Sequence, residues 1–171
     1  MIHNQLETDR LLLRMWRNED FEPYAKMCAD LEVMHFLGGK ALDRAEVWRH
    51  MAFLVGHWHF RGYGPWAVEE KATGQFLGRI GFLNPEDWPG FEIGWILNRQ
   101  SWGKGYATEG ATRALKYAWE ELGMTHVISL IHANNKNSIR VAERLGEKEE
   151  GKTQIFGRDV LIYGIDRPLN S

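Results

Sequence analysis

Residues 91–110 read FEIGWILNRQSWGKGYATEG, and this stretch decides the fold. Its first part, Phe91 to Leu97, is a short apolar segment typical of a buried strand. A glycine-rich turn follows, and a long amphipathic helix begins near Tyr106. Such a turn leaves backbone N–H groups unpaired at the positive end of the helix dipole, and its glycines let a ligand approach the backbone closely. The stretch therefore predicts an anion site, which most often binds phosphate.

Two well-known phosphate motifs do not match this turn. A Walker A loop needs a lysine between its last glycine and a hydroxyl residue, and a dinucleotide fingerprint needs a third glycine where Thr108 stands. The pattern [QR]-x-x-G-x-[GA] does match, with Gln100, Gly103 and Gly105 at its fixed positions. With EIGW before it and YATE after it, the turn resembles the acetyl-CoA loop of the GNAT N-acetyltransferase superfamily.

The composition predicts one globular domain over residues 1–171. Hydrophobic residues make up 44% and charged residues 26%, and the net charge is −2. This balance gives no general attraction to nucleic acid or to a membrane surface, and no apolar run approaches the roughly 20 residues that cross a bilayer. The N-terminus lacks the features of a signal peptide and a single cysteine excludes an internal disulfide, so we expect a cytoplasmic protein.

The order of the expected elements indicates a mixed α/β sheet. We expect strands at 6–16, 65–70, 76–83, 91–97, 127–133, 148–156 and 158–165, the second and third forming a hairpin. We expect helices at 19–29, 43–60, 106–122 and 135–146. This is also the element order of the GNAT fold, so the resemblance implies a twisted, mostly antiparallel sheet of about seven strands with four helices.

Two further segments are similar to the RimJ/RimL-like branch of the superfamily. They are LETDRLLLR, residues 6–14, and NKNSIRVAERLG, residues 135–146. Glu147 departs from the pattern, because the family usually has an aromatic or aliphatic residue there, and we expect the strand that follows to be shifted or more exposed. The branch suggests a protein N-terminal amine as acceptor, whereas other relatives acetylate small-molecule amines.

The resemblance assigns acetyl-CoA as the co-substrate and implies which residues bind it. They are Trp95, Ile96, Leu97, Gln100, Trp102, Gly103, Lys104, Gly105, Tyr106, Ala107, Thr108, Asn135 and Ser138. The backbone of residues 95–97 would pair with the pantetheine amides and polarise the thioester carbonyl. The alternative is an ordinary central strand whose N–H groups are all used within the sheet. Arg99 and Arg140 are further cations that would offset phosphate charge, or else solvated surface groups.

Glu92 is the candidate general base. Acetyl transfer needs a neutral acceptor amine, and a carboxylate whose pKa is raised by its surroundings can remove the proton. Glu92 lies between apolar Phe91 and Ile93, directly before the cofactor segment, and several GNAT enzymes have a glutamate on this strand. The alternative is a strand-end carboxylate that is satisfied by an arginine or a backbone N–H.

Ser138 is the second candidate catalytic residue. Many GNAT enzymes use a tyrosine on the fourth helix to protonate the leaving thiolate, but no tyrosine lies between Asn134 and Gly146. Ser138 stands at the corresponding position, and we expect it to donate a hydrogen bond to the sulfur as a positioning group. Its alternative role is capping the helix with Asn135 or Asn137.

Other notable residues have structural interpretations. His50, His57 and His59 do not form a metal set, because residues two apart on a helix do not face each other and no other ligand completes the group, so we predict no metal. Cys28 is expected to be a core thiol. Trp88, beside two acids, belongs either to an ordinary polar loop or to a site for a cationic acceptor.

Together these patterns predict an enzyme that transfers acetyl from acetyl-CoA to a primary amine in a ternary complex. The alternative is a non-catalytic acyl-CoA-binding or regulatory module on the same fold. A protein that binds ATP or NAD is disfavoured by both motif mismatches. The eight tryptophans and the habit of the family are consistent with a homodimer.

Overall fold

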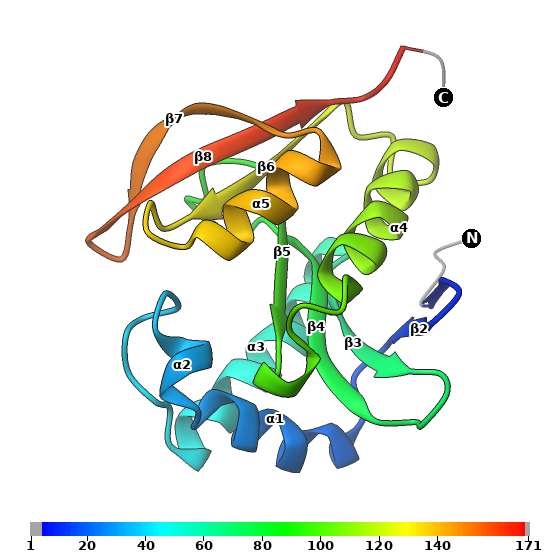
Figure 1. The fold of residues 1–171 in the computed structure, drawn as a ribbon, viewed down its shortest axis with the longest axis vertical. Helices are drawn as coiled ribbons and strands as arrows, with labels where there is room; N and C mark the ends of the chain where they lie inside the picture. Colours follow the sequence, from blue (N-terminus) through cyan, green and yellow to red (C-terminus); the bar gives the residue numbers. More distant parts are fainter. Residues whose placement is uncertain (1–4, 170–171) are drawn as a thin grey trace.

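The computed structural model describes residues 5–169, which fold around one eight-stranded sheet (Figure 1). The strands are β1 (Leu6–Glu7), β2 (Leu11–Arg14), β3 (Pro65–Glu70), β4 (Phe76–Leu83), β5 (Glu92–Leu97), β6 (His126–Ile131), β7 (Lys148–Ile155) and β8 (Arg158–Asp166). The helices are α1 (Phe21–Cys28), α2 (Leu31–Met34), α3 (Arg44–Arg61), α4 (Tyr106–Glu120) and α5 (Lys136–Leu145). Short 3-10 turns, Asn18–Asp20 and Arg99–Ser101, precede α1 and α4.

The strands follow the order β1-β2-β3-β4-β5-β6-β8-β7, and among the described pairs only β5 and β6 run parallel. The predicted mixed, mostly antiparallel α/β sheet is therefore confirmed. It has eight strands instead of about seven because the expected strand 6–16 is divided into a hairpin. Thr8 turns the chain there: its N–H donates to the Leu11 carbonyl, and its hydroxyl accepts from the Leu11 N–H at 2.9 Å.

Local capping fixes the ends of the helices. In α3 the Asp43 carboxylate accepts from the Glu46 N–H at 2.8 Å, and the Glu46 carboxylate accepts from the Asp43 N–H at 2.9 Å, so the expected capping box is present. The helix ends at Gly62, whose φ of 75° favours glycine. The short helix α2 was not predicted, and it begins at Asp30, whose side chain accepts from the Glu32 N–H. Between residues 5 and 169, every helix falls short of the length and apolar character needed to cross a membrane.

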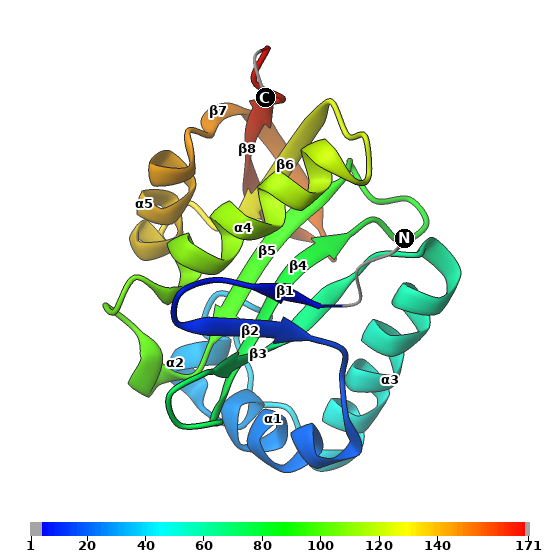
Figure 2. The same cartoon turned by 90° about the vertical axis from the view of Figure 1, so that its right-hand side faces the viewer.

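The helices cover the sheet in two layers. One apolar cluster joins α4 to the sheet, and it includes Ala111, Ala114 and Ala118, which form an alanine stripe along one side of the helix. A second cluster joins α1, α2 and α3 to the other face, where it meets Ile96 of β5. In Figures 1 and 2, α4 and α5 lie together, apart from α1, α2 and α3. The two faces of β5 are therefore covered by different helices, α4 on one side and α1, α2 and α3 on the other.

The sheet opens between β5 and β6. Among the described residues, Glu92 and Ile128 form the one paired position between these strands. Beyond that point the strands diverge, as Figure 1 shows by their different directions. The divergence leaves one edge of β5 without a strand partner in the middle of the sheet.

Candidate active site

The glycine-rich turn presents unpaired backbone amides. Gly103 and Gly105 have φ of 72° and 80°, a left-handed conformation that favours glycine. Gly105 is the N-cap of α4, and no side chain caps this helix. The Glu109 N–H makes the first backbone bond of the helix, so the amides of residues 106–108 have no acceptor within the described chain. The backbone of the predicted anion site is therefore open.

The hairpin of β1 and β2 holds this turn in place. The Arg10 guanidinium donates to the Lys104 carbonyl at 2.9 Å and to the Glu109 carboxylate at 2.7 Å. It also lies over the Tyr106 ring, 4.4 Å from the centroid, and the Tyr106 hydroxyl donates to the Glu70 carboxylate. Sequence reasoning missed Arg10, because no local pattern connects residues more than 90 positions apart.

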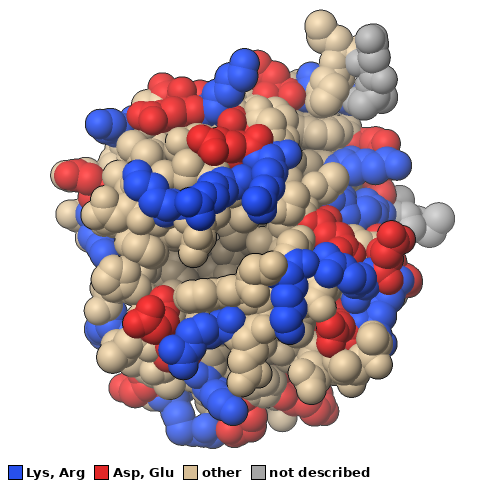
Figure 3. All heavy atoms as spheres, viewed as in Figure 1, with Lys and Arg blue, Asp and Glu red and all other residues tan. Residues whose placement is uncertain are grey.

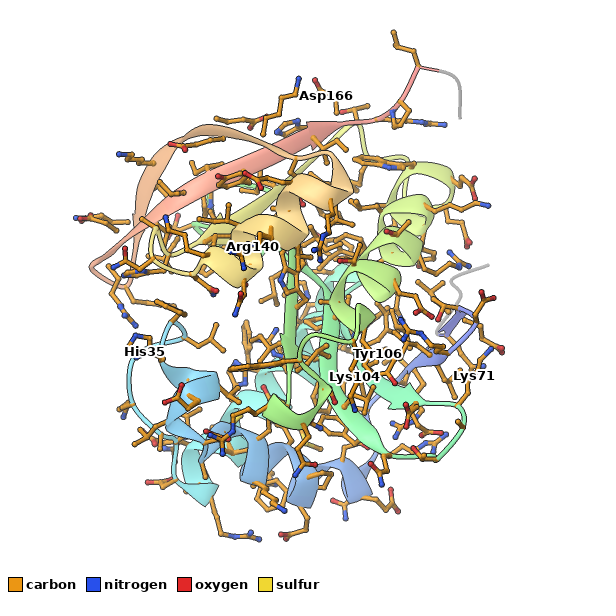
Figure 4. All side chains as sticks on the ribbon, viewed as in Figure 1. His35, Lys71, Lys104, Tyr106, Arg140 and Asp166 are labelled. Atoms are coloured by element: carbon orange, nitrogen blue, oxygen red, sulfur yellow. The ribbon has the colours of Figure 1, made fainter. Side chains whose placement is uncertain are left out.

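A cavity of about 530 Å³ lies between the turn, β5, α5 and the segment around α2. Figure 3 shows this hollow in the space-filling view, and Figure 4 shows Arg140, Tyr106 and His35 around it from three different elements. Most of the predicted cofactor residues line it, namely Trp95, Ile96, Leu97, Trp102, Gly103, Gly105, Tyr106, Ala107, Thr108, Asn135 and Ser138. Gln100, Lys104 and Glu92 do not line it, and the first two are exposed at the surface.

The open edge of β5 faces this cavity. The Phe91 carbonyl accepts from the Ile128 N–H and the Ile93 carbonyl accepts from the Ser129 hydroxyl, so these residues point toward β6. Because backbone groups alternate along a strand, those of Trp95 and Leu97 point the same way, beyond the last paired position. The Leu97 carbonyl is occupied by the Trp102 indole N–H at 2.9 Å. The alternative of an ordinary, fully paired central strand does not hold.

Glu92 is the first residue of β5, where β5 leaves β6. Its Oε2 accepts from the Trp88 indole N–H at 2.7 Å, and its carboxylate accepts from the Leu130 backbone N–H. Burial raises the pKa of Glu92 to about 7, although these hydrogen bonds and the charge of Arg79 act in the opposite direction. At neutral pH the carboxylate is therefore partly ionised and able to accept a proton.

A buried histidine anchors the loop that carries Trp88. The Asn84 N–H donates to His57 Nε2 at 3.0 Å, so the ring proton is on Nδ1, which donates to the Tyr63 carbonyl at 2.9 Å. His57 thus has the structural role expected from the sequence, and it fixes the start of the loop. Trp88 is more than part of an ordinary polar loop, because it orients Glu92. The sequence placed it near the strand, but only the folded loop showed which atom it contacts.

The family follows from similarity to known proteins. A family model described as an acetyltransferase (GNAT) domain matches residues 10–148. The chain belongs to the GNAT acetyltransferase family. It is 32% identical to the uncharacterized protein YkkB of Bacillus subtilis, over 93% of this chain and 94% of that protein. It is 28% identical to the uncharacterized N-acetyltransferase YoaA of the same organism, over 95% and 97% of the two chains. A solved acetyltransferase structure from Agrobacterium tumefaciens is 30% identical, with a TM-score of 0.86 over 95% of this chain and 94% of that one.

GNAT enzymes use acetyl-CoA, and the residues at the turn fit its phosphate groups. Thr108 Oγ1 is buried without a hydrogen-bond partner, and it adjoins the open amides of residues 106 and 107. A bound anion would satisfy the hydroxyl and the amides together. Arg140 and Arg144 line the same cavity, whereas Arg99 pairs with Asp30 at 3.2 Å. The donors present therefore suit a phosphorylated ligand.

Asn135 and Ser138, both at the start of α5, have different roles. Asn135 Oδ1 accepts from the Ser138 N–H at 3.2 Å, so Asn135 is the cap of the helix. The Ser138 hydroxyl has no hydrogen bond to a described residue, and Ser138 lines the cavity. The hydroxyl is available to a ligand, and its contact with the cofactor sulfur stays a prediction.

The expectation that the strand after Glu147 is shifted or more exposed is confirmed, because β7 is largely exposed and has an irregular register. Glu147 itself lies before this strand and is only 3% exposed. Its Oε1 is 3.0 Å from Ser129 Oγ, which also lies 3.1 Å from the Ile93 carbonyl oxygen. The Ser129 hydroxyl is thus a donor to both oxygens, and its bond to Glu147 acts to lower the pKa of that carboxyl. Burial raises the pKa of Glu147 to about 7, and its Oε2 has no partner. The irregular register of β7 lies between Glu149 and Gly151.

The remaining candidates lie in structural environments. Cys28 is buried in the cluster under α1, where burial raises the pKa of its thiol, as expected for an inert core cysteine. Within residues 5–169 no group of three or more His, Cys, Asp or Glu side chains is arranged to hold a metal ion.

Proposed function

We propose that this GNAT protein transfers the acetyl group of acetyl-CoA to a primary amine by direct attack in a ternary complex. The position of Glu92 is the observation that supports this most. The carboxylate is held at the start of β5, beside the gap between β5 and β6. Acetyl-CoA would enter this gap from the side of α4 and α5, and the amine from the side of α1 to α3. The two substrates would then meet without an acetylated enzyme residue.

In this proposal Glu92 takes the proton that the amine must lose. An α-amino group has a reference pKa of about 8 and a lysine-type amine about 10.4. With its own pKa raised to about 7, Glu92 is better matched to an α-amino group, because the proton transfer is then nearly balanced. The acceptor is thus a protein N-terminal amine or a small-molecule amine, and Glu92 favours the less basic members of each class.

The other groups would position the thioester that acetyl-CoA supplies. The backbone N–H groups of Trp95 and Leu97 face the gap and are available to polarise its carbonyl. The Ser138 hydroxyl would donate a hydrogen bond to the sulfur. Because a thiol has a pKa of about 8.5, protonation of the departing group makes only a mild demand on the site. The amides of residues 106–108 and the Thr108 hydroxyl would hold the phosphates.

Purified protein, acetyl-CoA and a panel of amines test this proposal. We expect CoA, but neither ATP nor NAD, to raise the melting temperature, and we expect free thiol release with at least one amine. Tight CoA binding without turnover for any amine would favour the non-catalytic module. Failure to bind CoA together with absence of thiol release would reject the proposal.

Thr108→Val tests the cofactor site with a nearly isosteric change. The variant removes a buried hydroxyl that has no protein partner, so the free energy of unfolding should be unchanged or higher. A hydrogen bond to a charged phosphate contributes about 1.5–3 kcal/mol, so CoA should bind roughly tenfold or more weakly in calorimetry. Thr112→Val is the matched control, because the Thr112 hydroxyl donates to the Thr108 carbonyl on the exposed side of α4. Unaltered CoA affinity in Thr108→Val would remove Thr108 from the site.

A further inference from the structure

Two arginines lie in one row across the sheet. Cross-strand pairs join Arg14 to Ala67, Ala67 to Arg79 and Arg79 to Ile96. Residues directly opposite each other in a sheet share a face, so both arginine side chains lie on the face covered by α1 and α3. Both are buried, with 6% and 9% of their surface exposed.

Arg14 shows how this fold accommodates a buried arginine. Its guanidinium forms two bonds of 2.9 Å with the two oxygens of Asp20. A third bond, of 2.8 Å, reaches the Glu69 carboxylate. The charge of Arg14 is therefore matched by two carboxylates.

Arg79 has no such counter-ion. It forms no ion pair with any residue that the structure describes, and its Nε is buried without a hydrogen-bond partner. On α1 and α3 it shares a side-chain hydrogen bond with the Tyr24 hydroxyl and influences the Cys28 thiol and the His50 ring. Burial and the charge of Arg79 lower the pKa of His50 to about 4, so the ring is neutral. A buried cation surrounded by neutral groups is unfavourable unless an anion joins it.

Open space adjoins Gly94 on the same face as Arg79. Glu92 and Gly94 precede Ile96 at a spacing of two residues, so they face the same side as Arg79. Gly94 is partly exposed, and a Cβ added there would meet only Glu92 Oε1, at 4.0 Å. Glu92 is close enough for Arg79 to lower its pKa, yet the two form no ion pair. The room above Gly94 therefore lies between a candidate base and a cation that forms no ion pair with a described residue.

We propose that Arg79 binds an anionic group, a carboxylate or a phosphate, carried by the amine that this enzyme acetylates. The inference rests on the proposed function. The amine nitrogen would lie at Glu92 and the anionic group of the same molecule at Arg79, whose planar guanidinium matches the geometry of both anions. Amino acids and phosphorylated amines are the simplest acceptors of this kind.

Matched pairs of amines test the inference on the whole protein loaded with CoA or acetyl-CoA. Glycine and methionine are compared with glycinamide and methioninamide for the carboxylate, and O-phosphoethanolamine with ethanolamine for the phosphate. Calorimetry measures binding to the CoA-loaded protein, and thiol release measures kcat/KM. We expect the anionic member of at least one pair to be preferred by about tenfold or more. Arg79→Met should abolish the preference, and Arg79→Lys should retain part of it.

Three controls keep the result interpretable. CoA affinity reports whether each variant folds. Arg49→Met removes an exposed cation of α3 and should change nothing. Arg158→Met removes the other arginine with a buried, unpartnered nitrogen, Nη1, which lies beside Gly39.

The inference is overturned by any of several results. These are a wild-type protein without preference for the anionic amines, an Arg79→Met variant that keeps the preference, or loss of the preference in Arg158→Met alone. A shifted pH–rate profile in Arg79→Met with unchanged preference would mean that Arg79 serves only Glu92. Acetylation of neutral amines without preference would leave the proposed function standing, whereas absence of both CoA binding and turnover would reject the two together.

Discussion

Glu92 and Glu147 are two buried carboxyls whose surroundings differ. Burial raises the pKa of each to about 7. Glu92 lies at the start of β5, where the Trp88 indole N–H orients it and open space adjoins Gly94. Glu147 follows the C-cap of α5 and is buried, its Oε1 bonds to Ser129, and its Oε2 has no hydrogen-bond partner among the described residues. A raised pKa alone shows only that a carboxyl is desolvated. Open space beside the carboxyl is the further property that distinguishes a candidate base from a buried acid.

The largest expected difference between Glu92 and Glu147 is in kcat. Glu92→Gln removes the proposed base, so kcat at pH 7 should fall about 10²- to 10⁴-fold while CoA affinity stays the same. Glu147→Gln should lower kcat far less, because Glu147 does not line the cavity and influences Glu92 only through its charge. Thiol release and CoA calorimetry on both variants check this. Equal losses of kcat in the two variants would contradict the distinction between Glu92 and Glu147. Unchanged kinetics in Glu92→Gln would show that Glu92 is not the base.

The pH dependence of stability should also report the buried acid Glu147. The folded-state pKa of Glu147 is about 7 and its ordinary value is 4.5, so the folded protein holds this proton more tightly than the unfolded chain. Its contribution to stability is fully present below pH 4.5 and is lost as pH rises through 7. A pKa difference of about 2.5 corresponds to about 3 kcal/mol, so Glu147 should account for a loss of up to that amount between pH 4.5 and 8. Glu147→Gln keeps the similar contribution of Glu92, so its loss should be smaller than that of wild type by about this amount.

Urea unfolding at pH 5 and pH 8 measures this loss. Glu149→Gln, an exposed neighbour, is the matched control and should behave like wild type. If Glu147→Gln keeps the full pH dependence of wild type, Glu147 is not the buried acid described here.

Trp88→Phe tests whether the Trp88 indole N–H sets the pKa of Glu92. The variant keeps an aromatic ring but loses the indole N–H that stabilises the ionised carboxylate, so the pKa of Glu92 should rise. The base is active when deprotonated, so the rising limb of the pH–rate profile should move to higher pH. We expect a roughly three- to tenfold lower rate at pH 7, with recovery near pH 9. An unmoved limb would show that Trp88 does not hold the base.

The smallest expected effect concerns Ser138. Ser138→Ala should lower kcat a few-fold through loss of the contact with sulfur, without loss of stability, because Asn135 caps α5. Asn135→Ala is the control and should cost about 1 kcal/mol in the free energy of unfolding. A Ser138→Ala variant with normal kcat would show that Ser138 lines the cavity without a catalytic contact.

Local patterns predicted much of the fold and part of the site. The apolar strand 91–97, the turn at Gly103 and Gly105 and the alanine stripe of α4 depend on neighbours a few positions apart, and each is present. The boundary errors have local causes as well. The strand 6–16 divides because Thr8 turns the chain, and the four-residue helix α2 is too short to give a periodic signal.

The exposed, shifted strand β7 agrees with the prediction, but the burial of Glu147 before it did not follow from the sequence. A charged residue after a helix C-cap is normally solvated, but here Ser129 of another strand offers a partner inside the protein. Glu92 was found from its flanking apolar residues, whereas Trp88, Arg10 and Arg79 gained their importance from partners on other elements.

The sequence by itself determined which segments become strands and helices, that a glycine turn exposes amides at the start of α4, and which glutamate stands before it. Those properties follow from side-chain periodicity and backbone freedom over a few residues. Only the tertiary structure decided that β5 and β6 separate after Glu92, that Glu147 is buried, and that Arg79 has no counter-ion among residues 5–169. Those properties depend on desolvation and on partners, and both are set by residues that only folding brings together.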